Sequence, residues 1–154
     1  IRRTMDRLGV KSVRPICSDS RYLDIDHPTI KADRVLVDPP CSALGVRPKV
    51  YDFTKESEIR ALAEYQRQFI KVASKIVKAN GVVVYSTCTL TTDEDEEIAR
   101  YAVEECELEL EGQEPYMCGS EGFQLPVQTV LTQRFHPHLH DTSGFFVARF
   151  RKIA

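Results

Sequence analysis

The sequence lacks any run of about 18 consecutive apolar residues, the length that a helix needs to span a membrane. It also lacks a basic and apolar start of the kind found in secretory signal peptides, internal repeats and low-complexity segments. Its 154 residues, 42% hydrophobic and 29% charged, suit one globular domain with a buried core. We therefore expect a soluble protein of the cytoplasm, or of the nucleus or nucleolus if the source is a eukaryote. Because residue 1 is Ile, we also expect the chain to begin inside a longer coding sequence.

Cysteine is present, but never as a pair spaced C-x-x-C. The five cysteines are an odd number spread over the chain: Cys17, Cys41, Cys88, Cys106 and Cys118. This pattern indicates neither a disulfide framework nor a zinc knuckle, so we expect reduced thiols. Cys17 and Cys106 are most simply interpreted as small buried hydrophobic residues.

The formal net charge is −2, but the two signs are unevenly distributed. Eleven of the 23 acidic residues lie between Asp93 and Glu114, beside a single base, Arg100. The rest of the chain has 20 bases and 12 acids, a net charge of +8. That excess can hold an anionic polymer while the acidic segment faces away from it. The alternative is a solvated acidic helix in a protein that binds no polymer, and charge alone leaves both open.

Turn residues and apolar periodicity divide the first half of the chain into helices and strands. Residues 2–8, closed by Gly9, predict a helix. Residues 55–79, with apolar side chains every three or four positions and Asn80-Gly81 after them, predict a longer one. Short apolar runs predict three buried strands. They cover residues 12–17, 34–37 and 82–85.

The second half predicts one more helix and a β-rich tail. Thr91 and Glu94 have the spacing of a capping box, so the helix begins near Thr92, and Ile98 and Ala102 contribute to its buried face. Three further strands are predicted at residues 107–111, 127–135 and 145–151. This order of elements indicates an α/β open sheet, mostly parallel with antiparallel C-terminal strands.

Open sheets of this class bind ligands where loops emerge from the carboxyl ends of their strands. The polar segments at these ends are Asp19, Asp38-Pro-Pro-Cys41-Ser42 and Ser86-Thr-Cys88-Thr89. We therefore expect two aspartates and two cysteines to converge on one rim. The alternative for Asp19 is a local turn with its flanking serines.

The residue after Asp38-Pro39-Pro40 distinguishes two chemistries. The prolines fix φ and remove two backbone donors, so the carboxylate of Asp38 stands at a rigid exit from its strand. The tetrapeptide resembles the Asp-Pro-Pro-Tyr signature of enzymes that methylate base amino groups, in which an aromatic ring stacks on a flipped base. Position 41 is a cysteine, which cannot stack. Thiol chemistry is therefore favoured over methylation of an amino group.

Thiol chemistry suits methylation at C5 of cytosine, which is a poor carbon nucleophile. A thiolate that adds to C6 turns the ring into an enamine, whose C5 attacks a methyl donor. Cys88 stands four residues before the helix predicted near Thr92, whose unpaired N–H groups stabilise negative charge. Loss of the C5 proton and expulsion of the sulfur then need a second acid or base, for which Cys41 and Asp38 are the candidates.

Three motifs, in order along the chain, resemble the signatures of one enzyme family. They are Asp38-Pro-Pro-Cys41-Ser42-Ala-Leu-Gly45-Val, Gly81-Val-Val-Val-Tyr-Ser86-Thr-Cys88-Thr and His138-Leu-His-Asp141-Thr-Ser-Gly144-Phe-Phe. The combination resembles the Sun-domain (Nol/Nop/Sun) family of S-adenosylmethionine-dependent RNA cytosine-C5 methyltransferases. The resemblance implies a Rossmann-like methyltransferase sheet, S-adenosylmethionine as the cofactor, and tRNA or rRNA as the substrate.

The resemblance also implies roles for individual residues. Cys88 matches the nucleophile that adds to C6, and Cys41 matches the cysteine that assists release of the methylated RNA. Asp38 is expected between the methyl donor and the cytosine, and Asp19 beside the adenine of the cofactor.

A further implication concerns the segment from Arg47 to Val50, which follows the first motif where the family approaches RNA. Arg47 and Lys49 are therefore candidates for contact with the substrate. The alternation of His136, His138 and His140 also suits one face of a strand, but no cysteine or carboxylate accompanies it at ligand spacing. We expect no metal there, and a hydrogen-bonding or RNA-facing role instead.

Two parts of the family pattern are missing from the sequence. The glycine-rich loop for the methionine end of the cofactor and the acidic residue for its ribose belong upstream of residue 1. We therefore expect residues 1–154 to be the C-terminal portion of a catalytic domain. The segment Asp141-Thr-Ser-Gly144 lacks the acidic residue that often precedes the glycine, so it is given no catalytic role. Two alternatives stay open: a base-amino methyltransferase and a non-catalytic RNA-binding or scaffold module.

Overall fold

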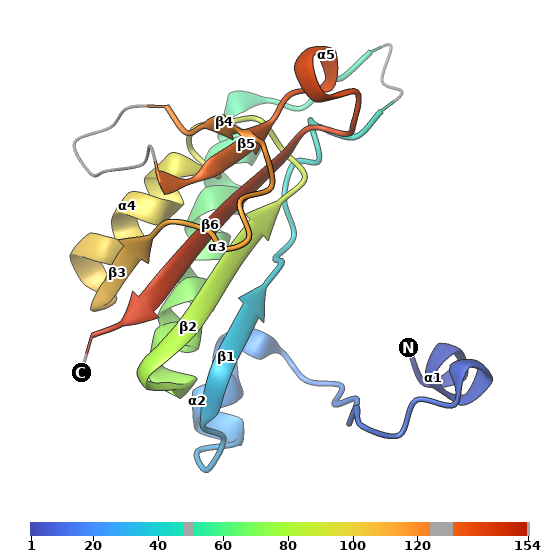
Figure 1. Ribbon diagram of the computed structural model, residues 1–154, viewed down its shortest axis with the longest axis vertical. Coiled ribbons are helices and arrows are strands. Elements are labelled where there is room, and N and C mark those ends of the chain that lie inside the picture. Colours follow the sequence, from blue (N-terminus) through green and yellow to red (C-terminus); the bar gives the residue numbers. More distant parts are fainter. Residues whose placement is uncertain (48–50, 124–130, 154) are drawn as a thin grey trace.

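The computed structural model describes residues 1–47, 51–123 and 131–153. Within these residues six strands form one sheet, and the long helices α3 (Glu56–Ile76) and α4 (Glu96–Glu105) lie against one face of it (Figure 1). The strands are β1 (Ala32–Val37), β2 (Val77–Thr87), β3 (Leu108–Glu111), β4 (Ser120–Glu121), β5 (Gln133–Phe135) and β6 (Phe145–Lys152). The short helical elements are α1 (Arg2–Leu8), the 3₁₀ turn η1 (Ser20–Tyr22), α2 (Leu23–Asp26) and α5 (Pro137–His140).

The sheet has the strand order β1-β2-β6-β5-β4, and β3 pairs with the end of β6. β1 and β2 are parallel and α3 connects them, whereas β6 is antiparallel to β2, β3 and β5. The carboxyl ends of β1 and β2 therefore lie side by side, where an open α/β sheet binds its ligands. The predicted α/β open sheet with antiparallel C-terminal strands is confirmed, and the β1–β2 pair is the parallel part of the described sheet.

The hydrophobic core lies between the sheet and the two long helices. Tyr85 of β2 and Phe146 and Phe150 of β6 are fully buried, because alternate residues of a strand share one face. Ile70 of α3 and Ile98 of α4 are fully buried on the opposite side of this interface. The apolar periodicity that predicted both helices is the periodicity of their contact with the sheet.

β2 begins earlier than the sequence predicts. The helix predicted at 55–79 ends at Ile76, because the backbone from Val77 onward pairs with β1. The strand predicted at 82–85 is accordingly 11 residues long. Asn80, with a φ of 60°, lies inside the strand, in the stretch where the pairing with β1 shifts register. The Asn-Gly pair therefore marks an irregularity in a strand and not the end of a helix.

Two predictions about the N-terminal segment have opposite outcomes. The helix predicted at 2–8 is α1, closed by Gly9 with a φ of 65°. The strand predicted at 12–17 is wrong, because this segment pairs with no strand in the described part of the chain and Val13 and Ile16 are exposed. An apolar run without a partner strand gains no ladder hydrogen bonds, so it forms no strand.

The cysteines away from the two motifs differ in burial. Cys106 is buried in the core, as predicted. Cys17 is exposed, so its interpretation as a buried hydrophobic residue is wrong, because the strand that was expected to bury it does not form. Cys118 is also exposed.

The acidic segment starts before α4. Glu94 precedes the first helical residue, Glu96, by two positions, and Asp95 is the N-cap, so the predicted capping box of Thr91 and Glu94 is wrong. The side chains of Glu94, Asp95 and Glu96 are all fully buried. This part of the acidic segment is therefore not the solvated face that the charge count allowed.

The remaining strands follow the predicted order. β3 lies within the predicted strand 107–111, and β6 within one residue of the strand predicted at 145–151. β5 covers the end of the strand predicted at 127–135, of which residues 127–130 lie outside the described residues. None of the described helices is both long and apolar enough to cross a membrane. In the same residues, no three histidine, cysteine or acidic side chains gather in a way that could hold a metal ion.

Candidate active site

The two motif cysteines meet at the carboxyl ends of the parallel strands. Cys88 directly follows β2, and Cys41 follows β1 after the rigid Asp38-Pro-Pro exit. Their Sγ atoms are 3.3 Å apart, within hydrogen-bonding distance for sulfur, and both side chains are half-buried. The two sulfurs are thus in contact, and neither cysteine is sealed in the core.

The surroundings of Cys41 favour the protonated form of its thiol. Partial burial and the hydrogen bond with Cys88 raise the pKa of Cys41 to about 11. At neutral pH Cys41 therefore carries its proton and can donate it in a hydrogen bond to the sulfur of Cys88. A protonated Cys41 is suited to be a donor toward Cys88, and it is a poor proton acceptor in the free protein.

Short contacts tie the loop of Cys41 to the loop of Cys88. The hydroxyls of Ser42 and Thr89, each one residue after a cysteine, are 2.7 Å apart. The backbone N–H of Gly45 donates to the carbonyl oxygen of Cys88 at 3.0 Å. These two contacts tie the two loops to each other close to the cysteines.

A buried polar cluster, which the sequence did not reveal, lies beneath the Cys41 loop. It consists of Glu94 and Gln66, both fully buried, and the hydroxyl of Tyr85. Gln66 Nε2 donates to Glu94 at 2.9 Å, and the Tyr85 hydroxyl lies 3.1 Å from Gln66 Oε1 and 2.7 Å from the Glu94 carbonyl oxygen. Glu94 was assigned to a helix cap and Gln66 to no role, because burial of polar side chains depends on the tertiary fold.

Asp38 stands at the end of β1 with an exposed carboxyl group. Its nearest polar partner is the hydroxyl of Ser86, which donates to Oδ1 at 3.4 Å, close to the limit for a hydrogen bond. Because Ser86 is two residues before Cys88, this contact places the carboxylate beside the strand that carries the second cysteine. The exposed carboxylate can accept a hydrogen bond from a ligand.

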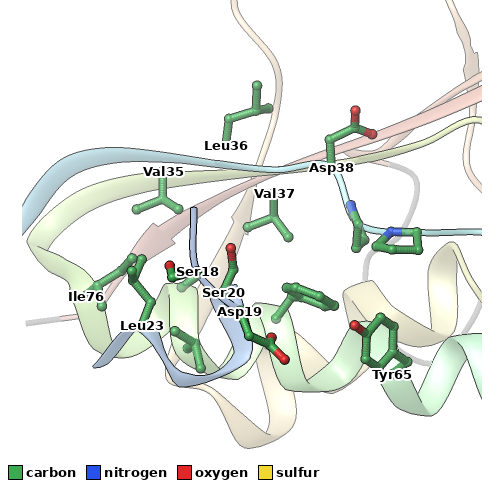
Figure 2. Close-up of a pocket in the computed structure, with 15 residues that line it drawn as sticks. Ser18, Asp19, Ser20, Leu23, Val35, Leu36, Val37, Asp38, Tyr65 and Ile76 are labelled. Carbon is green, nitrogen blue, oxygen red and sulfur yellow. The ribbon is translucent and has the colours of Figure 1, made fainter. Parts of the chain in front are cut away.

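A cavity of about 510 Å³ lies beside the end of β1, bordered by the turn at Asp19 and by α3 (Figure 2). Val35 and Val37 point into it from β1, and Tyr65 borders it from α3 (Figure 2). Asp19 and Asp38 both line the cavity, but Figure 2 shows them on opposite sides of β1, with Asp19 on the side of α3. The structure brings the two cysteines together and gives the two aspartates separate positions around the cavity.

Asp19 is held in place by its neighbour Arg21. The guanidinium donates to both carboxylate oxygens, at 3.0 Å from Nε to Oδ1 and 2.5 Å from Nη2 to Oδ2. These hydrogen bonds hold the pKa of Asp19 below its usual range. The carboxylate also accepts from the backbone N–H of Arg21 and so caps η1, while the guanidinium lies 4.7 Å from the centre of the Tyr65 ring. Asp19 therefore forms a local turn through Arg21 and not through its flanking serines, and it also lines the cavity.

Of the two basic candidates for substrate contact, Arg47 lies within the described residues and Lys49 does not. Arg47 is exposed, and its guanidinium lies 3.5 Å from the carboxylate of Asp141. Of the three histidines, His136 and His140 are linked by a hydrogen bond from the backbone N–H of His136 to Nδ1 of His140 at 2.9 Å.

Comparisons with known proteins point to one family. The chain is 44% identical over 148 residues to the tRNA (cytosine(72)-C(5))-methyltransferase of Pyrococcus horikoshii, covering 96% of this chain and 36% of that protein. It is 37% identical over 134 residues to the rRNA (cytosine-C(5))-methyltransferase NOP2C of Arabidopsis thaliana, covering 77% and 22%. The crystal structure of NSun6 from P. horikoshii with SFG matches with a TM-score of 0.89 at 42% identity, covering 99% of this chain and 38% of that one. The chain thus spans between about a fifth and two fifths of the length of these relatives.

The family comparison covers almost the whole chain. Residues 1–151 match the family described as 16S rRNA methyltransferase RsmB/F. The family resemblance drawn from the three motifs is thereby confirmed, and so is the methyltransferase class of the fold. The chain belongs to the 16S rRNA methyltransferase RsmB/F family.

Proposed function

We propose that this chain carries the paired-cysteine centre of an enzyme that methylates C5 of cytosine in tRNA or rRNA, with S-adenosylmethionine as the methyl donor. The observation that carries the proposal is the 3.3 Å distance between the sulfurs of Cys41 and Cys88 at the ligand-binding end of the sheet. The names of the relatives from P. horikoshii and A. thaliana, both RNA cytosine-C5 methyltransferases, support it.

Cys88 is the nucleophile in this proposal. Its thiolate forms a bond to C6 of the cytosine, and the electron pair of the C5–C6 double bond becomes available at C5. S-adenosylmethionine, when bound, supplies the methyl group. The C5 proton then leaves, the C6–S bond breaks, the double bond forms again and the electron pair of the broken bond returns to the sulfur of Cys88.

Cys41 and Asp38 have different roles in the loss of the C5 proton and the release of the Cys88 sulfur. Because the pKa of Cys41 is raised to about 11, its thiol carries a proton that stabilises the departing sulfur of Cys88 through a hydrogen bond. Asp38 has an exposed carboxylate at the same strand end and is the group suited to accept the C5 proton. Cys41 therefore assists release of the RNA, and Asp38 acts beside the methyl donor and the base.

The cavity beside β1 fits part of the cofactor. Its apolar walls, from Val35, Val37 and Tyr65, suit a flat base, and the carboxylate of Asp19 can accept a hydrogen bond from an adenine amino group. Asp38 adds negative charge that complements a sulfonium cation. These residues hold and orient the cofactor at the end of β1.

The RNA approaches through the segment that follows the Cys41 loop. Arg47, exposed and only weakly paired with Asp141, and Lys49 are the proposed contacts to its phosphates. The net charge of +8 outside residues 93–114 favours such an anionic partner. A tRNA or rRNA substrate places the enzyme in the cytoplasm, or in the nucleus or nucleolus of a eukaryote.

The test uses the full-length protein, RNA transcripts and S-adenosylmethionine with a labelled methyl group. We expect label in 5-methylcytosine, identified by mass spectrometry of the digested RNA. Cys41→Ala should accumulate a protein–RNA adduct that survives denaturing gels, whereas Cys88→Ala should form neither adduct nor product. Turnover by Cys88→Ala would show that the nucleophile is assigned wrongly. Label on the exocyclic amino group of cytosine (N4-methylcytosine) or of adenine (N6-methyladenine) would support the base-amino alternative, and RNA binding without any label would support a non-catalytic module.

A further inference from the structure

Glu94 is a buried carboxylate that accepts hydrogen bonds from Ser42 of the Cys41 loop and from two other parts of the chain. Its side chain is fully buried, between the end of β2 and the start of α4. Four uncharged groups donate to it. They are the backbone N–H of Ser42 at 2.9 Å, the hydroxyl of Ser42 at 2.5 Å, Gln66 Nε2 at 2.9 Å and the hydroxyl of Thr91 at 2.9 Å. Both carboxylate oxygens thus act as acceptors, two donors to each.

These contacts restrain both residues that flank Cys41 in the chain. The N–H of Ser42, which follows Cys41, donates to Glu94 Oε1. Gln66 Nε2 donates both to the same oxygen and to the carbonyl oxygen of Pro40, which precedes Cys41, at 3.0 Å. The peptide groups on each side of the cysteine are therefore fixed to one buried pair, Glu94 and Gln66.

The same pair is anchored to the strand that carries the other cysteine. The hydroxyl of Tyr85, three residues before Cys88 in β2, lies within hydrogen-bonding distance of Gln66 Oε1 and of the Glu94 carbonyl oxygen. Ser42, held by Glu94, in turn contacts Thr89 beside Cys88. Glu94 is thus connected to the chain next to both sulfurs, and its hydrogen bonds go to the neighbours of the cysteines and not to the sulfurs.

We propose that Glu94 is a positioning residue, which with Gln66 fixes the Cys41 loop so that the sulfur of Cys41 is held against that of Cys88. The proposal deepens the proposed function and rests on it for its catalytic consequence. The claim about geometry is separate: it concerns only the position of the Cys41 sulfur relative to the Cys88 sulfur. Burial removes a carboxylate from water at a cost in free energy, which its four hydrogen bonds offset while they also restrain the loop.

The relative position of the two sulfurs can be tested without RNA or cofactor. The measured quantity is the rate at which Cys41 and Cys88 form a disulfide. The probe is diamide, a diazene. Its N=N bond is reduced to a hydrazine as the two thiols lose two hydrogens and form one S–S bond. The protein carries Cys17→Ser and Cys118→Ser, since both of those thiols are exposed, while Cys106 is buried. Peptide mapping by mass spectrometry identifies the Cys41–Cys88 pair.

We expect Glu94→Ala to slow this crosslinking by about tenfold or more, because loss of orientation between reacting groups lowers rates by such factors. Glu94→Gln is the conservative variant. Its amide oxygen can keep the contacts of Oε1 with Ser42 and Gln66, and its NH₂ can donate to the hydroxyls of Ser42 and Thr91. Glu94→Gln should therefore crosslink at close to the parent rate. Crosslinking of folded Glu94→Ala at the parent rate would overturn the proposal.

The matched control is Gln133→Ala, which removes another buried, hydrogen-bonded side chain, in β5. It should lower the melting temperature but leave the crosslinking rate unchanged, and an equal slowing in this variant would show that general destabilisation explains the effect. If Glu94→Ala does not fold, Gln66→Met, which is similar in size, removes the donor to Pro40 and Glu94. Gln66→Met should crosslink more slowly than the parent, and an unchanged rate would overturn the proposal.

Methylation by the full-length protein separates this proposal from the proposed function. Glu94→Ala should lower kcat with little change in KM for RNA, and Glu94→Gln should restore kcat. If the parent protein methylates no RNA, the proposed function fails, but the crosslinking rates still decide whether Glu94 positions Cys41.

Discussion

Gly144 donates its backbone N–H to the carbonyl oxygen of Gly45 at 2.7 Å, and the two residues pack backbone against backbone. A Cβ on Gly45 would lie 2.3 Å from the oxygen of Gly144, and a Cβ on Gly144 would lie 2.7 Å from the Cα of Gly45. Gly45 also donates to the carbonyl oxygen of Cys88. The contact therefore joins all three sequence motifs, and the last motif supports the Cys41 loop although it has no assigned catalytic role.

This contact predicts the effect of adding one methyl group. Gly45→Ala and Gly144→Ala should each lower the free energy of unfolding by about 1–3 kcal/mol, because the atom nearest to each added Cβ belongs to the backbone and cannot rotate away. Both should also slow the Cys41–Cys88 crosslinking. Urea denaturation measures the first effect. Gly112→Ala is the control, since nothing lies within 4 Å of its added Cβ, and equal stability of all three variants would contradict the prediction.

The meeting of Cys41 and Cys88 was predictable because it depends on short-range patterns and one topological rule. An apolar run ending in Asp-Pro-Pro and another ending in Ser-Thr-Cys each mark the end of a buried strand. Parallel neighbours place these ends on the same edge of a sheet. The parallel pairing of β1 and β2 brings the two cysteine loops to that shared edge, but it does not by itself set the distance between the sulfurs.

The partners of the buried acidic residues were not predictable in the same way. Glu94, Asp95 and Glu96 stand in a charged run that is typical of a solvated helix, and their burial depends on donors far away in the sequence. Gln66 reaches Glu94 from α3, and Arg134 reaches Glu96 from β5. No local pattern indicates which carboxylates will have such partners. The sequence therefore suggested a helix cap and a solvated helix face.

Arg134 is fully buried and forms ion pairs with Glu96 and Asp95, which are fully buried as well. Arg134→Met should lower the free energy of unfolding by about 3–5 kcal/mol, because it leaves buried carboxylates without their cation. Thermal and urea denaturation measure this loss. Arg60→Met, which breaks an exposed pair with Glu56, is the control and should cost about 0–1 kcal/mol. Similar losses in both variants would show that burial does not determine the strength of the Arg134 pairs.

The reactivity of Cys41 should depend steeply on pH. With its pKa raised to about 11, only about one molecule in a thousand carries the thiolate at pH 8, whereas a thiol of ordinary pKa is about one quarter ionised. Iodoacetamide should therefore modify Cys41 on the order of 100-fold more slowly than free cysteine at pH 8, with a rate that rises about tenfold per pH unit up to about pH 11. Peptide mapping of the protein with Cys17→Ser and Cys118→Ser gives this rate.

Removal of Cys88 tests the cause of that slow reaction. The hydrogen bond with Cys88 is one of the two main causes of the raised pKa of Cys41, so Cys88→Ala should lower this pKa and speed the alkylation at pH 8. An unchanged pH profile in Cys88→Ala would mean that burial alone raises the pKa.

The cavity beside β1 predicts a measurable contribution of Asp19 to cofactor affinity. Isothermal titration of residues 1–154 with S-adenosylmethionine should show weak binding, since the cavity offers contacts for only part of the cofactor, and micromolar binding would show a more complete site. Asp19→Asn keeps a side chain that can cap η1 but removes the negative charge, so it should weaken this binding by about 3–10-fold, or roughly 0.7–1.4 kcal/mol. The matched control is Asp33→Asn, which changes an exposed carboxylate of β1 that is paired with Lys78 of β2 and does not line the cavity. Equal affinities for the parent and Asp19→Asn would remove Asp19 from the cofactor site and leave it as the cap of a turn.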